Sequence, residues 1–122
     1  MTGTVIMSLN CSVENDAFRD DPNITPISFD QTLVGGGNPG MVDIGTSEED
    51  ISFGDITPGF VIIQNMDATN YVQIGPKSGG AMIAYQKIRP GRFALIELDA
   101  GVTMRAKANT ATVRLRIRGY AI

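Results

Sequence analysis

The side chains that could perform acid–base or nucleophilic chemistry in this sequence are few. Its 122 residues contain no histidine, which excludes Ser-His-Asp and Cys-His arrangements and histidine metal sites. The single cysteine, Cys11, excludes a thiolate zinc cluster and an intramolecular disulfide. Two carboxylate pairs remain, Glu97 with Asp99 and Glu48 with Asp50, and such pairs could nominally hydrolyse glycosides. Neither pair has a flanking aromatic platform for a sugar, so we predict no catalytic residue and no enzymatic activity.

Two glycine-rich stretches resemble phosphate-binding loops in composition only. Residues 35–40 (GGGNPG) and 75–80 (GPKSGG) lack the Gly-Lys-Ser/Thr ending and the following helix that such a loop requires. We therefore predict a flexible connection at the first stretch and a turn at the second. No cofactor site is predicted.

An acidic segment over residues 12–23 contains Asp16, Asp20 and Asp21. These carboxylates do not follow the spacing of a calcium-binding loop, so no metal site is predicted. We expect a solvated loop, with one helical turn over residues 14–18 as the alternative. Cys11, just before this segment, is in phase with the apolar residues of the preceding stretch and is expected to be a buried free thiol.

The clearest element is the stretch Thr112–Arg118, in which apolar and cationic side chains alternate. Successive side chains of an extended strand point to opposite faces, so the apolar and cationic sets lie on opposite sides. This pattern is typical of an antiparallel sheet with one face on a core and the other face exposed or bound to a partner. The candidate interface on the outer side is Arg114, Arg116, Arg118 and Tyr120, and a simply solvated face is the alternative.

Short apolar or alternating runs separated by turn residues fill the remainder of the chain. The other predicted strands cover residues 4–11, 25–34, 41–45, 51–54, 60–65, 71–74, 81–88, 93–98 and 102–107. Residues 46–50 are predicted to be a turn, with a single helical turn as the alternative. Such spacing predicts an all-β fold, an antiparallel β-sandwich of about eight to nine strands with jelly-roll or related Greek-key topology.

The chain length predicts a single domain over residues 1–122 with one hydrophobic core. The side chains expected to anchor this core are Phe60, Ile62, Tyr71, Ile74, Phe93, Leu95, Val113, Leu115 and Ile117. No apolar run is long enough for a membrane-spanning helix, and the N-terminus does not indicate a secretory signal, so folding in a cytoplasm is expected.

Charge is distributed unevenly along the sequence. Residues 1–74 carry eleven acids and one base, whereas residues 75–122 carry nine bases and two acids. Complementary charge of this kind acts either within one monomer or between copies in an assembly. Nucleic-acid binding is not favoured, because the basic half has little aromatic interleaving and the net charge of the chain is −3.

Several runs in the second half resemble small all-β structural proteins encoded in tailed-bacteriophage genomes. The runs are Ile51–Ile56 (ISFGDI), Phe60–Gly75 (FVIIQNMDATNYVQIG), the Arg89–Arg92 turn (RPGR) and Gly101–Ala111 (GVTMRAKANTA), followed by the closing strand. The resemblance covers about the last 75 residues. It implies a virion protein, made in the host cytoplasm, similar to capsid decoration or cement proteins.

This resemblance implies a dimer or trimer that binds the major capsid protein or another virion protein and stabilises the head lattice. The alternative is a tail, fibre or baseplate component, which would include a glycan-binding sandwich if Tyr71, Tyr85 or Tyr120 cluster in one groove.

Overall fold

The computed structural model describes residues 3–31 and 37–122 and contains thirteen strands and no helix within those ranges. The strands are β1 (Gly3–Asn10), β2 (Val13–Asn15), β3 (Phe18–Asp20), β4 (Asn23–Gln31), β5 (Gly37–Ile44), β6 (Glu49–Asp50), β7 (Phe60–Asn65), β8 (Val72–Ser78), β9 (Ala81–Met82), β10 (Gln86–Ile88), β11 (Phe93–Glu97), β12 (Met104–Ala108) and β13 (Val113–Tyr120). All strand pairs in these ranges are antiparallel, so the predicted all-β, antiparallel class is confirmed.

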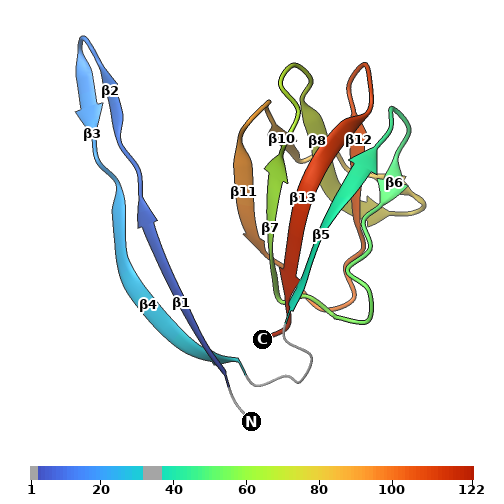
Figure 1. Cartoon of the computed structure of the whole chain (residues 1–122), viewed down its shortest axis with the longest axis horizontal. Helices are drawn as coiled ribbons and strands as arrows, with labels where there is room; N and C mark the ends of the chain where they lie inside the picture. The colour runs from blue at the N-terminus through green and yellow to red at the C-terminus, as the bar shows by residue number, and fades with distance from the viewer. Residues whose placement is uncertain (1–2, 32–36) are drawn as a thin grey trace. The chain divides into compact units, whose positions relative to one another are not determined.

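The contacts divide the chain into two compact units, Met1–Val34 and Gly35–Ile122. In the N-terminal unit, β1 pairs with β4 and β2 pairs with β3 to form one long hairpin (Figure 1). The acidic loop predicted over residues 12–23 is therefore wrong, because most of it forms the β2–β3 hairpin. At its tip the Asn15 side chain accepts a hydrogen bond from the backbone N–H of Ala17 at 3.0 Å, which closes a tight turn without a helical segment.

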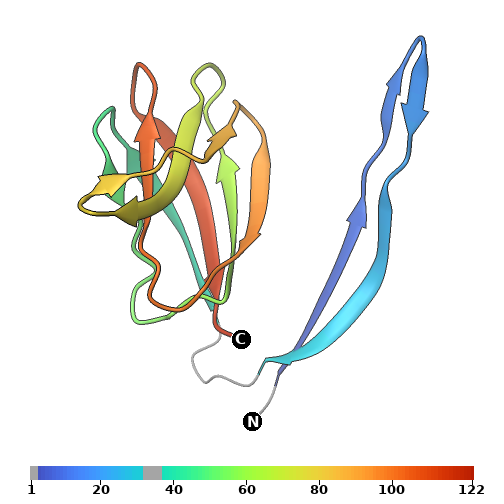
Figure 2. The same ribbon diagram turned by 180° about the vertical axis from the view of Figure 1, so that it is seen from behind.

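The C-terminal unit contains two sheets (Figures 1 and 2). One has the strand order β11-β7-β13-β5, and we call it the β13 sheet. The other has the order β10-β8-β12-β6, with β9 paired to the far end of β8, and we call it the β8 sheet. From β5 to β13 the chain moves from one sheet to the other at every connection except those that join β8, β9 and β10.

Side chains from both sheets form one hydrophobic core, and alternation along each strand decides which ones enter it. Its buried members are Ile44, Ile51, Phe53, Val61, Ile63, Val72, Ile74, Ile88, Met104, Ala106, Ala108, Val113, Leu115 and Ile117. The core predictions for Ile74, Val113, Leu115 and Ile117 are thus confirmed. Ile62 and Tyr71 are only half-buried.

The core prediction is wrong for Phe93 and Leu95, whose side chains are 68% and 49% exposed. In β11 the alternate residues Ala94 and Ile96 pack against the core instead. Because every residue from Phe93 to Ile96 is apolar, the sequence pattern did not reveal which alternate set faces inward.

Two predicted glycine-rich connections are partly strand. β5 begins at Gly37, so residues 37–40 of the predicted connection are paired with β13. The other two residues of that connection, 35 and 36, lie outside the described residues. β8 continues through Gly75 to Ser78, and the turn is confined to Gly79 and Gly80, whose φ angles are +60° and +86°. A Cβ atom at Gly75 in β8 would overlap the carbonyl oxygen of Ile83. Glycine at this position therefore lets the backbone around Ile83 lie close against β8.

Other predicted boundaries shift by a few residues. The predicted turn at 46–50 contains β6, and the predicted strand 51–54 is irregular although Ile51 and Phe53 are buried in the core. The predicted strand 81–88 is interrupted at residues 83–85. The described part of the predicted strand 25–34 ends at Gln31, and residues 32–34 lie outside the described residues. Cys11 is half-buried rather than buried.

Candidate docking surface

The predicted alternation along β13 is present in the structure. Val113, Leu115 and Ile117 are buried, whereas the residue after each of them, Arg114, Arg116 and Arg118, is exposed. All three arginines therefore lie on the outer face of the β13 sheet, directed away from the core.

The three arginines differ in their partners. Arg114 Nε donates to Asp43 Oδ1 at 2.9 Å across the β13–β5 pair. This hydrogen bond lowers the pKa of Asp43 and raises the pKa of Arg114. Within the described residues, Arg116 and Arg118 have no ion-pair partner. These two charges are available to a binding partner.

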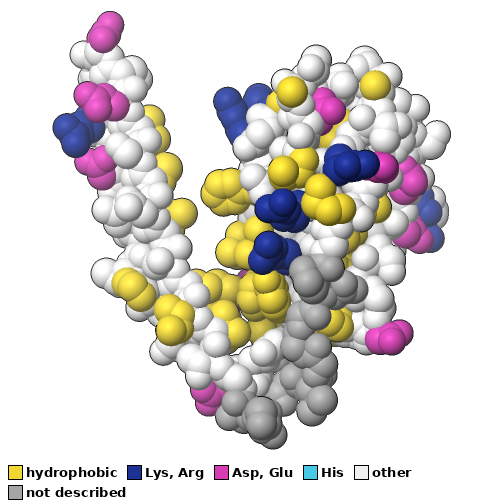
Figure 3. Space-filling model, in the orientation of Figure 1, with side chains coloured by type: hydrophobic (Ala, Val, Ile, Leu, Met, Phe, Trp, Pro, Cys, Tyr) yellow, Lys and Arg dark blue, Asp and Glu magenta, His cyan; other side chains and the backbone are white. Residues whose placement is uncertain are grey.

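Apolar side chains lie beside the unpaired arginines in register. Arg116 lies opposite Met41 of β5 on one side and opposite Gln64 of β7 on the other. Gln64 in turn lies opposite Phe93 of β11, so these residues form one row across the sheet. The row of Arg118 continues through Ile62 to Leu95. Among these, Met41, Phe93 and Leu95 are 51%, 68% and 49% exposed. Figure 3 shows cationic side chains interspersed with hydrophobic ones over this sheet.

The outer face of the β13 sheet is also shallowly hollowed. A depression of about 270 Å³ is lined by Ile62, Gln64, Arg116, Arg118 and Tyr120. Tyr120 is half-buried, and its ring stacks on that of Phe60 with the centroids 4.9 Å apart. The four predicted interface residues thus share one face. We call this surface the arginine face; it consists of those four residues and their neighbours Met41, Ile62, Gln64, Phe93 and Leu95.

Sequence reasoning missed the apolar half of this face. Ile62, Phe93 and Leu95 were assigned to the core, and Met41 was assigned only to a short strand. The available signal was that β11 has apolar side chains in both alternate sets, which is expected when a strand has a core on one side and a binding surface on the other.

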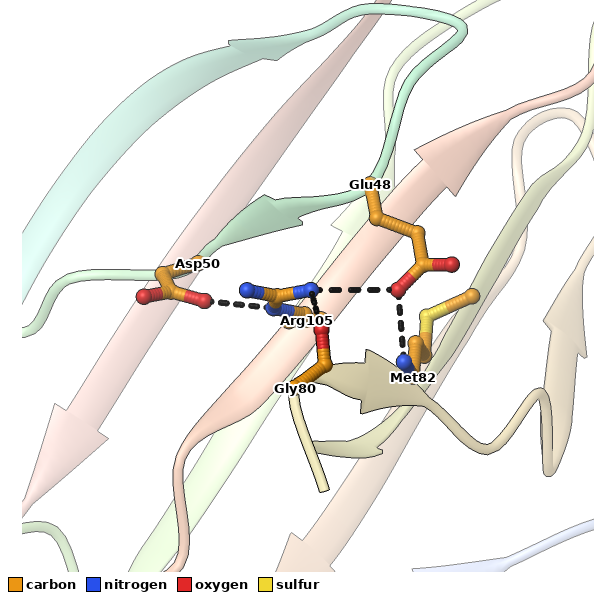
Figure 4. A network of polar contacts seen from close by, with 5 residues as sticks. All are labelled: Glu48, Asp50, Gly80, Met82 and Arg105. Carbon is orange, nitrogen blue, oxygen red and sulfur yellow. Dashed lines mark hydrogen bonds and ion pairs between the residues drawn. The ribbon is translucent and has the colours of Figure 1, made fainter. Parts of the chain in front are cut away.

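The carboxylate pair Glu48 and Asp50 is bound by an arginine (Figure 4). Arg105 Nε contacts Asp50 Oδ1 at 2.7 Å, and Arg105 Nη1 contacts Glu48 Oε1 at 3.2 Å and donates to the Gly80 carbonyl at 3.0 Å. The backbone N–H of Met82 donates to the same Glu48 oxygen.

These contacts lower the pKa of both carboxyls. The Met82 hydrogen bond contributes most for Glu48, and the Arg105 hydrogen bond contributes most for Asp50. A general acid would need a raised pKa. The Arg105 cluster joins β6, β12 and the β8–β9 turn.

The second carboxylate pair borders a cavity of about 260 Å³ near β8, β10 and β11. Glu97 and Asp99 line it together with Tyr85 and Gln86, and the rest of its lining is mainly apolar. The side-chain oxygen of Gln86 is buried and has no hydrogen-bond partner in the part of the chain that the structure describes. This cavity could accept a small donor-bearing group.

The three tyrosines lie at separate places. Tyr85 is 79% exposed beside the cavity, and Tyr120 lines the depression of the arginine face. Tyr71 lies under the Lys87 ammonium, 4.0 Å from the ring centroid. They do not form a common aromatic platform.

In the described ranges no group of three or more His, Cys, Asp or Glu side chains is arranged to hold a metal ion. Those ranges also contain no helix of the length and apolarity needed to cross a membrane. No protein-family model matches the sequence, and neither a curated protein nor a solved structure matches it.

Proposed function

We propose that the protein is a non-enzymatic structural component of a tailed-bacteriophage virion, a capsid decoration or cement protein that stabilises the head lattice. The observation that carries this proposal is the arginine face, where Arg116 and Arg118, which have no ion-pair partner within the described residues, lie among exposed apolar side chains. Interface cores typically combine arginine with aromatic and methionine side chains. The proposed partners are the major capsid protein, another virion protein and further copies of this chain, in a dimer or trimer.

The topology supports this proposal. Jelly rolls consist of eight strands in two sheets, and they occur in viral capsid and lectin domains. The paths β11-β7-β13-β5 and β10-β8-β12-β6 contain eight strands, and the chain alternates between them except from β8 to β10. We therefore propose a jelly-roll sandwich for residues 37–122. Many unrelated functions share one fold, so the functional claim rests on the arginine face and not on the topology.

The state of the carboxylates supports a non-catalytic role. Arg105 binds both Glu48 and Asp50, which keeps their charges compensated within the fold. A cement function requires only complementary surfaces, which steer docking through charge and hold it through apolar contact.

A second candidate is a tail, fibre or baseplate component with a glycan-binding sandwich. The cavity beside Tyr85 favours it, because Gln86, Glu97 and Asp99 offer acceptors to sugar hydroxyls next to an exposed ring. The separate positions of the three tyrosines weigh against it, and we therefore prefer the head lattice.

The test is to add purified protein to capsids that lack it. The cement proposal expects saturable binding and restored resistance of the capsids to heat and low salt. Electron microscopy of virions with the tagged protein then shows label over the head. Failure to bind capsids, together with label at the tail tip, would reject the cement function and favour the second candidate.

A further inference from the structure

The strand β11 forms one edge of the β13 sheet, and it lacks the features that usually protect an edge strand. Within the described residues it pairs with β7 alone. Figures 1 and 2 show it at the lateral edge of the C-terminal unit, with no further strand of that unit beyond it. Its sequence, Phe93–Glu97, contains no proline, glycine or lysine, and its register with β7 is continuous. An exposed, apolar edge of this kind is a template for another strand.

The other edge strands of this unit are shorter or interrupted. β5, at the opposite edge of the same sheet, contains Pro39, which has no N–H to donate. β10 and β6, at the two edges of the β8 sheet, contain three and two residues. Among the strands described in this unit, β11 therefore offers the longest uninterrupted edge.

The backbone groups of β11 that face the open edge belong to Phe93, Leu95 and Glu97. At the end of the β11–β7 pair, the Leu98 N–H donates to the Gly59 carbonyl at 2.8 Å. In an antiparallel ladder, alternate residues direct both N–H and C=O toward the same neighbouring strand. The even-numbered residues of β11 therefore face β7, and the three odd-numbered ones direct N–H and C=O away from it.

The two ends of β11 carry charges of opposite sign. Arg89 and Arg92 lie in the turn before the strand, whereas Glu97 ends it and Asp99 follows. All four side chains are exposed, and none has an ion-pair partner within the described residues. An antiparallel copy of the strand brings each basic end beside an acidic end, whereas a parallel copy brings like charges together. The edge is therefore complementary to itself.

We propose that β11 pairs antiparallel with β11 of a second copy, about a two-fold axis at Leu95. Leu95 then lies opposite Leu95 of the second copy and Phe93 lies opposite its Glu97, so the outward N–H and C=O groups gain partners. Phe93 and Leu95, which are 68% and 49% exposed in the single chain, become partly covered. Such an interface is isologous and closes at two copies.

The charges set the direction of pairing. Arg92 would lie opposite Leu98 of the second copy, between its Glu97 and Asp99. Directly opposed Cα atoms are roughly 5 Å apart, which is less than the Debye length of about 8 Å at physiological ionic strength. The attraction therefore acts whichever side of the sheet each charged side chain takes. Main-chain hydrogen bonds and the contact between the opposed Leu95 side chains then hold the pair.

The β11 pairing rests on the part of the proposed function that includes further copies of the chain among the partners. It deepens that part by assigning the contact to β11 and by specifying a dimer rather than a trimer. The two four-stranded sheets become one continuous sheet, with both arginine faces on the same side. Capsid binding remains a separate measurement.

The first test is sedimentation equilibrium of the full-length protein and of Leu95→Pro. We expect a dimer whose dissociation constant rises by roughly tenfold or more in the variant. The proline removes an N–H that points to the open edge and leaves the hydrogen bonds to β7 intact, so the fold should be retained. Leu95→Lys should show the same loss, because it places like charges directly opposite each other.

Met41→Lys provides the matched control. Met41 is 51% exposed on the outer face of the same sheet, but it lies on β5 at the opposite edge. The dimer should therefore be unchanged in this variant. Thermal unfolding checks that each variant is folded, and Leu95→Lys replaces Leu95→Pro if the proline variant is not.

The second test exchanges the charges at the ends of β11. Arg89→Glu/Arg92→Glu makes both ends acidic, and Glu97→Lys/Asp99→Lys makes both ends basic. Each double variant alone should dimerise more weakly than the wild type. An equimolar mixture should form a heterodimer, which native mass spectrometry distinguishes by mass.

Four results would overturn the β11 pairing: a wild-type protein that stays monomeric at all concentrations, a trimer, a dimer of wild-type strength in both Leu95 variants, or a mixture that associates no better than its components. Capsid binding by a monomeric wild type would leave the proposed function intact while removing the pairing. A dimer that fails to bind capsids would do the reverse.

Discussion

At the scale of single residues, Gly119 in β13 shows why one position tolerates no side chain. A Cβ atom there would lie 2.6 Å from Cδ1 of Phe53, which is 7% exposed and belongs to the core. We expect Gly119→Ala to lower the free energy of unfolding by about 1–3 kcal/mol through overpacking. Urea denaturation measures this change.

Gly40 serves as the control for this substitution. It lies on β5 in the same sheet, opposite Ile117, and a Cβ there meets nothing within 4 Å. Gly40→Ala should therefore lower the free energy of unfolding only slightly. Equal losses in the two variants would show that backbone freedom, and not contact with Phe53, makes glycine necessary at position 119.

The Arg105 cluster predicts an acid-sensitive contribution to stability. The pKa values of Glu48 and Asp50 are lowered from their ordinary values of 4.5 and 3.8. The unfolded chain therefore takes up protons at a higher pH than the folded chain does. This stabilisation is fully present above pH 4.5 and is lost as the pH falls through the lowered folded pKa values.

Thermal unfolding between pH 6 and pH 3 tests this expectation. The double variant Glu48→Gln/Asp50→Asn should lose less melting temperature over this interval than the wild type does. Glu97→Gln removes an exposed carboxyl outside the cluster and should follow the wild type. A double variant with the wild-type slope would show that the cluster does not contribute to the acid sensitivity.

At the scale of elements, β13 joins the core to the docking surface through its alternation. Leu115 is fully buried, so Leu115→Ala should reduce the free energy of unfolding by about 2–5 kcal/mol. Arg116 is exposed and has no ion-pair partner among the described residues, so Arg116→Ala should leave the free energy of unfolding within about 0.5 kcal/mol of the wild type. Chemical denaturation of both variants compares the two faces of one strand. A large loss of unfolding free energy in Arg116→Ala would contradict the assignment of Arg116 to the outer face.

At the scale of the whole molecule, the contiguous cluster of buried apolar side chains that the structure describes runs from Ile44 to Ile117. We therefore expect a chain that starts at Gly35 to retain cooperative unfolding, because it keeps both sheets and the complete core. Calorimetry of this shortened chain would show a single sharp transition. A broad, non-cooperative transition would mean that the hairpin is required for the core to form.

Much of the fold could be predicted from local pattern. The alternation of Thr112–Arg118 correctly separates core from surface. The predicted strand 60–65 coincides with β7, and the predicted strand 102–107 overlaps β12, which begins two residues later at Met104. The four predicted interface residues were correctly placed on one face for the same reason, since alternation is a property of a single strand.

The unpredicted features depend on contacts between distant segments. The side chain of Asn65, at the end of β7, is fully buried and donates to the Ile88 carbonyl at 3.0 Å and to the Asn70 carbonyl at 2.9 Å. Nothing in the run Phe60–Asn65 indicates that this amide links the two sheets. The Arg105 cluster likewise joins groups 55 and 57 residues apart in the chain.

The sequence by itself determined the all-β class, the absence of histidine and the two sides of β13, because composition and a period of two are local properties. Only the tertiary structure decided that Phe93 and Leu95 face outward, that β1 pairs with β4 as a hairpin, and that among the described residues Arg114 has an ion-pair partner while Arg116 and Arg118 have none. Those outcomes depend on register between strands, and a shift of one residue reverses which side chains meet the core.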